Sequence, residues 1–264
     1  MPENDKCMKQ IKMRPNFGEH YLFYNMTFQP YQQFMLVPVG SWNYNCADEH
    51  SDVDTKAIFI PTLRDIVENK REAYTHLLPN EEHIDCCDIR SYMTSLIKGN
   101  PQFLETLFSN WGDLNTGYYG EEIHTLIHMR EDIARCNPNN TIRALLGMAD
   151  RNYKLCISRG EEDHLGKWVY QLVRIEECMD KYRQCRDFDD CLHTDKRDFL
   201  LSLKNNEYNK EVLTANAEAF IARCHNHYDS FISMNNKENK WTQYQVEQIV
   251  MQVIRKSIEK FDKS

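Results

Sequence analysis

Two short motifs in the N-terminal part of the sequence combine residue types that could bind a phosphate group and a metal ion. Gly40-Ser41 follows an apolar run, and after ten intervening residues Asp52 and Asp54 stand directly before a second apolar run. Side chains two positions apart on a β-strand point to the same face, so we expect Asp52 and Asp54 to project together. Two carboxylates on one face repel each other, and hard oxygen ligands favour Mg²⁺ or Mn²⁺ as the neutralising cation.

The glycine-serine motif offers a place for phosphate oxygens beside that cation. Glycine allows close backbone approach, so the amides of Gly40 and Ser41 and the Ser41 hydroxyl could hold an anion. A nucleoside triphosphate chelated to two metal ions fits this arrangement, with in-line attack on its α-phosphorus. Two-metal catalysis also needs a third carboxylate. Asp85, in the predicted strand 83–89, is our candidate; Asp88 is the alternative, although helix capping explains Asp88 equally well.

A helical segment further along the chain carries two cations on one face. Lys167, Gln171 and Arg174 are spaced at i, i+4 and i+7, which aligns them on one side of a helix. Lysine and arginine in this position could bind the triphosphate tail or an acceptor phosphate. The alternative is a solvated or salt-bridged helix face.

Three further residues near the motifs could contribute to the same site. Lys56 shares the predicted strand face of Asp52 and Asp54, so it could pair with these carboxylates or contact a phosphate. Tyr44 lies inside the loop between the motifs, and among the aromatic residues it is the one we expect to stack a base. Glu105 could contact the residues that bind the ligand without touching the ligand itself, although an exposed helix glutamate is the ordinary expectation.

The spacing Gly-Ser-x(10)-Asp-x-Asp resembles the core signature of the polymerase-β-like nucleotidyltransferase superfamily. Asp-x-Asp alone is frequent in loops and helix caps, but the two motifs together, each beside a predicted strand, favour a metal site. Residues 40–56 are most similar to the predicted nucleotidyltransferases associated with RNA repair, which have a Gly-Ser-x-x-Tyr-Gly start and a Ser-Asp-x-Asp end. Tyr44 and Ser51 match that pattern, whereas Asn45 replaces its second glycine.

Later stretches extend the resemblance over about residues 34–230. Residues 98–105 are similar to the family's Lys-Gly-Asn-Pro segment, and residues 166–174 are similar to its Gly-Lys-x-x-x-His-x-x-Arg helix. Residues 200–208 resemble a further element with a basic residue, Gly, Glu and a hydroxyl or aromatic residue. Gln171 replaces the histidine of the second stretch, so a proton-transfer role is not carried over to it.

The resemblance implies an enzyme that transfers a nucleoside monophosphate from an NTP, such as ATP, to a hydroxyl and releases pyrophosphate. It implies an RNA end as the acceptor, with Mg²⁺ held by Asp52, Asp54 and Asp85. Two alternatives stay open: nucleotidylation of a protein or small molecule, and a non-catalytic nucleotide-binding interaction protein. The net charge of −8 suits an acceptor that is not a polyanion, but a local basic cleft would cancel that argument.

The elements that must position these residues change in character along the chain. Apolar runs predict strands at 34–39, 55–60 and 83–89, and the apolar spacing within 63–77 is compatible with a helix. From Ile89 onward the period approaches 3.6, with a helix stop at Gly99 and a new start at Asn100-Pro101. Further helices are predicted at 121–135, 140–158, 164–184, 195–204, 208–228 and 240–262. We therefore expect an α+β fold with a mixed sheet and flanking helices in residues 1–115, followed by an all-α domain in residues 116–264.

The composition is typical of a folded protein that acts in the cytoplasm. The longest apolar run is far shorter than a membrane span, and the first residues lack the layout of a signal peptide, so we expect no membrane partner. Ten cysteines in such a chain are expected to be reduced thiols. Zinc at Cys178, Cys185, Cys191 and His193, or around Cys224, is a weaker alternative because the ligand spacing is irregular.

Overall fold

The computed structural model describes residues 20, 31–48, 51–158, 164–205, 208–234 and 236–261, and the strands in these ranges form one sheet. The strands are β1 (Gln32–Pro38), β2 (Thr55–Ile60), β3 (Ala73–Leu77), β4 (His83–Asp88) and β5 (Asp113–Leu114). They lie in the order β3-β4-β2-β1-β5, with β2 and β4 parallel and the other neighbours antiparallel. The mixed sheet confirms the predicted fold class, and the three predicted strands correspond to β1, β2 and β4.

The segment 63–77 contains the expected helix, but the helix covers only its first five residues and the last five form a strand. Helix α2 (Leu63–Val67) begins with a capping box in which Thr62 and Asp65 exchange hydrogen bonds. It ends near Asn69, whose φ of 51° is incompatible with continuing the helix. β3 then forms the sheet edge, and most of its side chains are exposed, so it lacks the buried alternation that identifies a strand.

The turn between the next two helices agrees with the sequence prediction. Helix α3 (Ile89–Ile97) is followed by Gly99, which has a φ of 67° and is tightly packed, because a Cβ there would collide with the Thr141 side chain. Asn100 caps helix α4 (Pro101–Leu104) by accepting a hydrogen bond from the Gln102 amide. A short 3-10 turn, η2 (Glu105–Leu107), continues from α4.

In the rest of the described chain, the regular elements apart from β5 are helices. Its helices are α5 (Thr116–His128), α6 (Arg130–Ala134), α7 (Pro138–Ser158), α8 (Leu165–Arg183), α9 (Phe188–Leu192), α10 (Arg197–Lys204), α11 (Lys210–Ser233) and α12 (Lys240–Phe261). The predicted helix 121–135 is divided between α5 and α6, and α9 was not predicted. The other five predicted helices agree with α7, α8, α10, α11 and α12.

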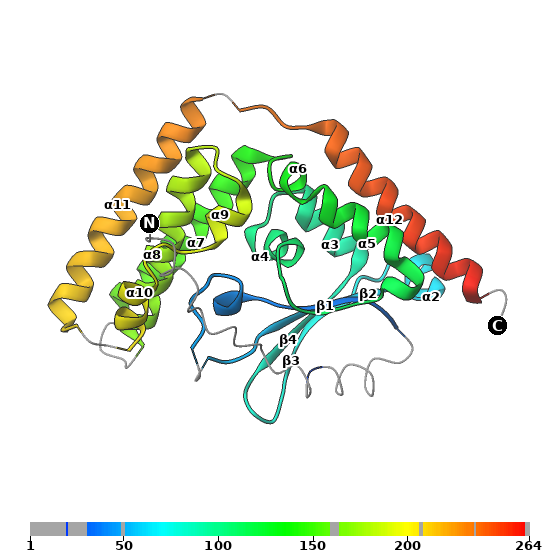
Figure 1. Ribbon diagram of the computed structural model, residues 1–264, viewed down its shortest axis with the longest axis horizontal. Helices are drawn as coiled ribbons and strands as arrows, with labels where there is room; N and C mark the ends of the chain where they lie inside the picture. The colour runs from blue at the N-terminus through cyan, green and yellow to red at the C-terminus, as the bar shows by residue number, and fades with distance from the viewer. Residues whose placement is uncertain are drawn as a thin grey trace, which may run out of the picture.

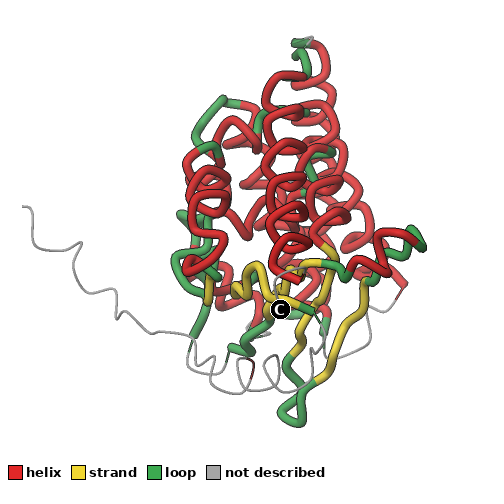
Figure 2. The backbone as a smooth tube through the Cα atoms, turned by 90° about the vertical axis from the view of Figure 1, so that its right-hand side faces the viewer, coloured by secondary structure: helices red, strands yellow, loops and turns green. Residues whose placement is uncertain are grey.

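One hydrophobic core joins the sheet to the helices. It extends without interruption from Phe34 in β1 to Val253 in α12. Figure 1 shows α7, α8, α10 and α11 grouped beside one end of the sheet, and Figure 2 shows the helices stacked above the strands. The last helix, α12, packs back against α3, α5 and β2. The division at residues 115 and 116 stays a prediction.

The alternation of side chains along the sheet decides which residues face the helices. Ile58 and Ile60 of β2 join the main core, whereas Ala57 and Phe59 join a smaller cluster on the opposite face. Lys56 has the same parity as Ile58, and the parallel register pairs Lys56 with Asp85. Both polar residues therefore lie on the helix-facing side of the sheet.

The described ranges contain neither a membrane-spanning helix nor a disulfide. None of the helices there combines the length and the apolar character needed to cross a membrane. The nine cysteines in these ranges are free, and all but Cys185 are buried, as expected for reduced thiols. Cys7, residues 49 and 50 of the motif segment, and residues 206 and 207 of the stretch 200–208 lie outside the described residues.

Candidate active site

A cleft of about 730 Å³ lies between the sheet and helices α7 and α8. The sheet side is formed by the start of β2, by β4 and by the β3 edge, and the floor includes the turn after β1. Six of the predicted site residues line it: Gly40, Tyr44, Asp54, Asp85, Lys167 and Arg174. Ser41, Asp52 and Lys56 lie outside the lining. The cleft therefore brings together both motifs and the basic helix, which are far apart in the sequence.

Asp54 and Asp85 form an acidic edge on the sheet wall. Asp54 stands directly before β2, where its carbonyl accepts a hydrogen bond from the Val39 amide at 2.9 Å. Asp85 lies in β4, the parallel neighbour of β2. The two side chains are 50% and 49% exposed, and Asp54 Oδ1 is 3.4 Å from His83 Nδ1. These half-exposed carboxylates keep oxygen atoms available to a ligand in the cleft.

Asp52 lies outside the lining of the cleft, and the expectation that Asp52 and Asp54 stand on one strand is wrong. β2 begins only at Thr55, and side chains elsewhere in the fold hold the backbone of residues 52 and 53. The Val53 amide donates to Glu82 Oε1 at 2.7 Å, and Trp42 Nε1 donates to the Asp52 carbonyl at 3.0 Å. The Asp52 side chain is exposed outside the cleft lining.

Lys56 is a partner of the acidic edge. Its Nζ lies 3.5 Å from Asp85 Oδ2 and 4.6 Å from the centre of the Phe103 ring. Thr75 Oγ1 donates to the other Asp85 oxygen at 2.6 Å. Because Lys56 is buried behind Asp85, the structure favours pairing with a carboxylate over direct contact with a phosphate.

The Gly40 amide already has a hydrogen-bond acceptor, Glu105. Gly40 has a φ of 76°, and its N–H donates to Glu105 Oε2 at 3.1 Å. Glu105 is only 3% exposed, so the expectation of an exposed glutamate is wrong. Burial raises the pKa of Glu105, and hydrogen bonds from Tyr44 and Gly40 only partly offset that rise. A phosphate at this amide would have to compete with the Glu105 side chain.

Tyr44 and Arg174 complete the buried floor. The Arg174 guanidinium lies 3.7 Å from the Tyr44 ring centre, and both residues are less than 10% exposed. Arg174 Nε also donates to Gln171 Oε1 at 3.3 Å. Burial, followed by the charge of Glu105, raises the pKa of Tyr44. One face of the Tyr44 ring is thus covered, and stacking on a base stays a prediction for the rest of the ring.

The basic helix α8 contributes one exposed and one buried cation to the cleft. Lys167, Gln171 and Arg174 all line it, with Lys167 exposed and Arg174 buried. This matches the single helix face inferred from their spacing. Of the two cations on this face of α8, Lys167 is therefore the more accessible to an incoming triphosphate.

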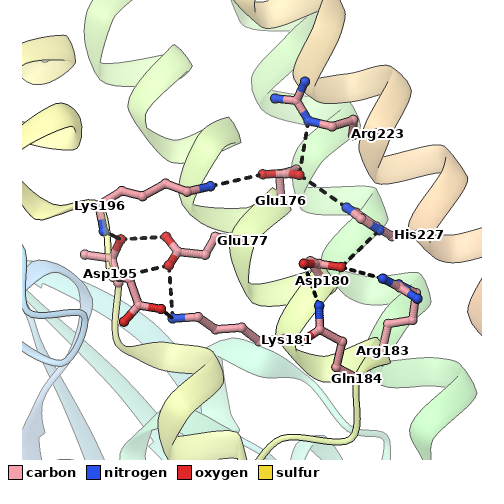
Figure 3. Close-up of polar contacts among 11 residues, drawn as sticks. Glu176, Glu177, Asp180, Lys181, Arg183, Gln184, Asp195, Lys196, Arg223 and His227 are labelled. Atoms are coloured by element: carbon pink, nitrogen blue, oxygen red, sulfur yellow. Dashed lines mark hydrogen bonds and ion pairs between the residues drawn. The ribbon is translucent and has the colours of Figure 1, made fainter.

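A charged network anchors the other end of α8 (Figure 3). Glu176 Oε1 accepts hydrogen bonds from Arg223 Nε at 3.1 Å and from His227 Nε2 at 3.2 Å, and both of these partners belong to α11. Lys181 Nζ lies 3.0 Å from Glu177 Oε1 within α8. By fixing α8 against α11, these contacts hold the helix that presents Lys167 to the cleft.

Sequence reasoning missed Arg151, Asn152 and Trp168, which also line the cleft. Trp168 stands three residues before Gln171 and so neighbours the helix face already identified, which could have suggested it. Arg151 and Asn152 belong to α7, and only the packing of α7 beside α8 brings them to the same cleft.

The acidic edge fits a divalent cation in donor chemistry, since Mg²⁺ and Mn²⁺ prefer carboxylate oxygens. Asp54 and Asp85 would supply these donors from adjacent strands. Among the described residues no three His, Cys, Asp or Glu side chains converge into a ready-made ion site, which also applies to the zinc alternatives. Completing the predicted trio would require Asp52 to turn toward the cleft.

Asp88, the alternative third carboxylate, has a structural role. It is 1% exposed and caps α3 by accepting from the Arg90 amide at 2.7 Å. The Arg90 guanidinium also forms an ion pair with it at 2.5 Å. These contacts occupy Asp88 fully, which leaves Asp85 as the third candidate.

Comparison with known proteins agrees with the resemblance found in the sequence. The chain matches the RNA repair pathway DNA polymerase beta family over residues 33–252, which is well over half of its length. No curated protein matches the chain. The family match indicates nucleotidyltransferase chemistry in general and an association with RNA repair. The mixed sheet, the helical second half and the extent of this match together show that the chain belongs to the RNA repair pathway DNA polymerase beta family.

Proposed function

We propose that the protein transfers a nucleoside monophosphate from an NTP, such as ATP, to a hydroxyl at an RNA end and releases pyrophosphate. The observation that carries this proposal is the composition of the cleft. Its sheet wall presents the carboxylates Asp54 and Asp85, and its helix wall presents the cations Lys167 and Arg174. A triphosphate needs cations for its negative charge, and its transfer chemistry needs carboxylates for a metal ion.

Some residues of the cleft would bind the substrate, and others would position the residues that bind it. Lys167 is exposed at the cleft and attracts the triphosphate, while the apolar surface of Trp168 and Met148 offers contact to the base. Lys56 and Thr75 hold the Asp85 carboxylate in a fixed orientation. Asp54 and Asp85, with Asp52 turned toward the cleft, would hold two Mg²⁺ or Mn²⁺ ions, which would neutralise phosphate charge and lower the pKa of the attacking hydroxyl.

Incubation with each labelled NTP, Mg²⁺ or Mn²⁺ and a panel of RNA, protein and small-molecule acceptors tests the proposal. We expect label on RNA with the wild type and none with the double variant Asp54→Ala/Asp85→Ala. Asp229→Asn, a change at an exposed α11 residue outside the cleft lining, is the matched control and should keep full activity.

Three results would change the interpretation. Label on protein or a small molecule, with RNA unlabelled, would replace the RNA acceptor. NTP binding without transfer to any acceptor would indicate a non-catalytic nucleotide-binding protein. Full activity in the double variant would show that the carboxylates of the cleft do not carry the reaction.

A further inference from the structure

A second hollow, of about 470 Å³, opens directly beside the cleft. It is lined by Lys98 at the end of α3, by Gln102 of α4, and by Arg143, Gly147 and Arg151 on α7, and we call it the basic groove. Gln102, Met148 and Arg151 line both hollows. The groove and the cleft therefore form one continuous depression along α7.

The charge of the basic groove is opposite to that of the whole protein. The chain has 40 acidic and 32 basic residues, yet the groove is lined by three cations and by no described Asp or Glu. Within the described ranges, Lys98, Arg143 and Arg151 are exposed and form no salt bridge with a carboxylate. The Arg143 guanidinium instead donates to Asn140 Oδ1 at 2.8 Å. These charges are consequently available to an anion from outside.

The length of the groove suits more than one phosphate. Arg143, Gly147 and Arg151 recur every four residues and share one face of α7. At a rise of about 1.5 Å per residue, roughly 12 Å separates the two arginines along the helix. A nucleic-acid strand carries a phosphate for roughly every 3.4 Å of helical rise, so this distance spans several groups. Gly147 lies between them without a side chain, and a Cβ there would touch nothing within 4 Å.

We propose that the basic groove binds the phosphate backbone of the acceptor RNA and leads its end past Arg151 into the cleft. This inference rests on the proposed function and adds where the acceptor strand lies. The contacts are to phosphates, so binding depends on salt and little on sequence. Arginine forks suit phosphate oxygens, and the neighbouring amides of Asn100 and Asn140 can hydrogen-bond to the sugar and phosphate oxygens.

Fluorescence anisotropy with a labelled single-stranded 12-nucleotide RNA, measured across a series of KCl concentrations, tests the groove. Arg143→Glu and Gly147→Glu should each weaken RNA binding about tenfold or more, because both place a carboxylate in the groove and Arg143→Glu also removes a cation. Arg143→Ala should flatten the slope of log K against log salt by about 0.7, the loss of one phosphate contact. The Kd for NTP should stay unchanged in all three variants.

Two control variants separate the groove from general effects. Gly147→Ala adds only a methyl group in open space and should bind RNA as the wild type does. Arg255→Glu makes the same charge change as Arg143→Glu at an exposed residue of α12 outside both hollows, and should also bind RNA normally. Circular dichroism of each variant checks that the fold is intact.

The outcomes for the groove and for the enzyme are distinguishable. If Arg143→Glu and Gly147→Glu leave the RNA affinity and the salt slope at wild-type values, RNA binding in the basic groove is contradicted, even if transfer to RNA occurs. Loss of RNA binding in these variants supports the groove, even if no transfer is found and the proposed function fails. A wild type that binds polyglutamate through Arg143 but binds no RNA would replace the RNA strand with an acidic protein segment.

Discussion

The floor and the acidic edge of the cleft differ in how firmly the fold holds them. At the floor, Gly40, Tyr44, Glu105 and Arg174 contact one another, and the three side chains are nearly inaccessible to solvent. At the edge, Asp54 and Asp85 are half exposed, and Asp52 lies outside the cleft lining. Buried polar groups must be hydrogen-bonded within the protein, whereas exposed carboxylates are solvated by water and stay free to bind a ligand. Changes at the floor should therefore alter stability, and changes at the edge should alter activity.

The largest expected effects come from two aspartates of β4. Asp85→Asn should slow nucleotide transfer at least about a hundredfold, about 2.7 kcal/mol of barrier, while the free energy of unfolding changes by less than about 1 kcal/mol. Asp88→Asn should lower the free energy of unfolding by about 3 kcal/mol, because it leaves the Arg90 guanidinium without its buried partner. Single-turnover kinetics and urea unfolding measure the two quantities. If both variants lose the same transfer rate per folded molecule, the assignment of Asp85 to activity and Asp88 to stability is contradicted.

Glu105 tests whether the floor is structural. Glu105→Ala should lower the free energy of unfolding by about 2–6 kcal/mol, because the Gly40 amide and the Tyr44 hydroxyl lose their acceptor at roughly 1–3 kcal/mol each. Its pKa is raised in the folded protein, so its contribution to stability is present at low pH and is lost as pH rises through the folded pKa. Urea unfolding from pH 4 upward should show this loss in the wild type and not in Glu105→Gln. A wild type whose stability rises over that range in step with the variant would show that Glu105 does not titrate there.

Glu176 is a buried carboxylate with the opposite behaviour. Burial alone would raise its pKa, but the hydrogen bond from His227 and the charges of Lys196 and Arg223 outweigh it and hold the pKa below its ordinary range. Its contribution to stability is present above a pH of about 4.3 and is lost as pH falls through the lower folded pKa. Glu176→Gln should cost about 1–2 kcal/mol at neutral pH and reduce the loss of stability in acid. An acid-unfolding midpoint identical to that of the wild type would contradict this assignment.

The smallest expected effect concerns Gly147, in the groove beside the cleft. Gly147→Ala should raise the free energy of unfolding by about 0.5–1 kcal/mol, since alanine favours the helix and its methyl group meets open space. Thermal unfolding measures it. A destabilised variant would mean that the groove floor is more tightly packed than the structure indicates.

Local sequence signals predicted the elements with strong hydrophobic patterns. β1, β2 and β4 are apolar runs, and Gly99 and Asn100 mark a helix boundary through their own conformational preferences. β3 escaped prediction because an exposed edge strand carries no buried alternation. An element could therefore be predicted where its own residues carry the pattern, and was missed where they do not.

The site residues also differ in whether local sequence signals could place them. The helical spacing of Lys167, Gln171 and Arg174 places them in one cleft, because periodicity is a local property. The position of Asp52 depends on Trp42 and on Glu82, which is far away in the sequence, and the burial of Glu105 depends on the turn after β1. Such tertiary contacts leave no local signal in the sequence, so neither outcome could be predicted.

The position of the transferred label tests the central claim most directly. With α-labelled NTP, Mg²⁺ and RNA, the account predicts that the wild type attaches the label to RNA. With γ-labelled NTP, it predicts that the label appears only in pyrophosphate, and that Asp54→Asn abolishes both products. Label from the γ-phosphate on the RNA, or α-label transfer that survives in Asp54→Asn, would contradict nucleotidyl transfer in this cleft.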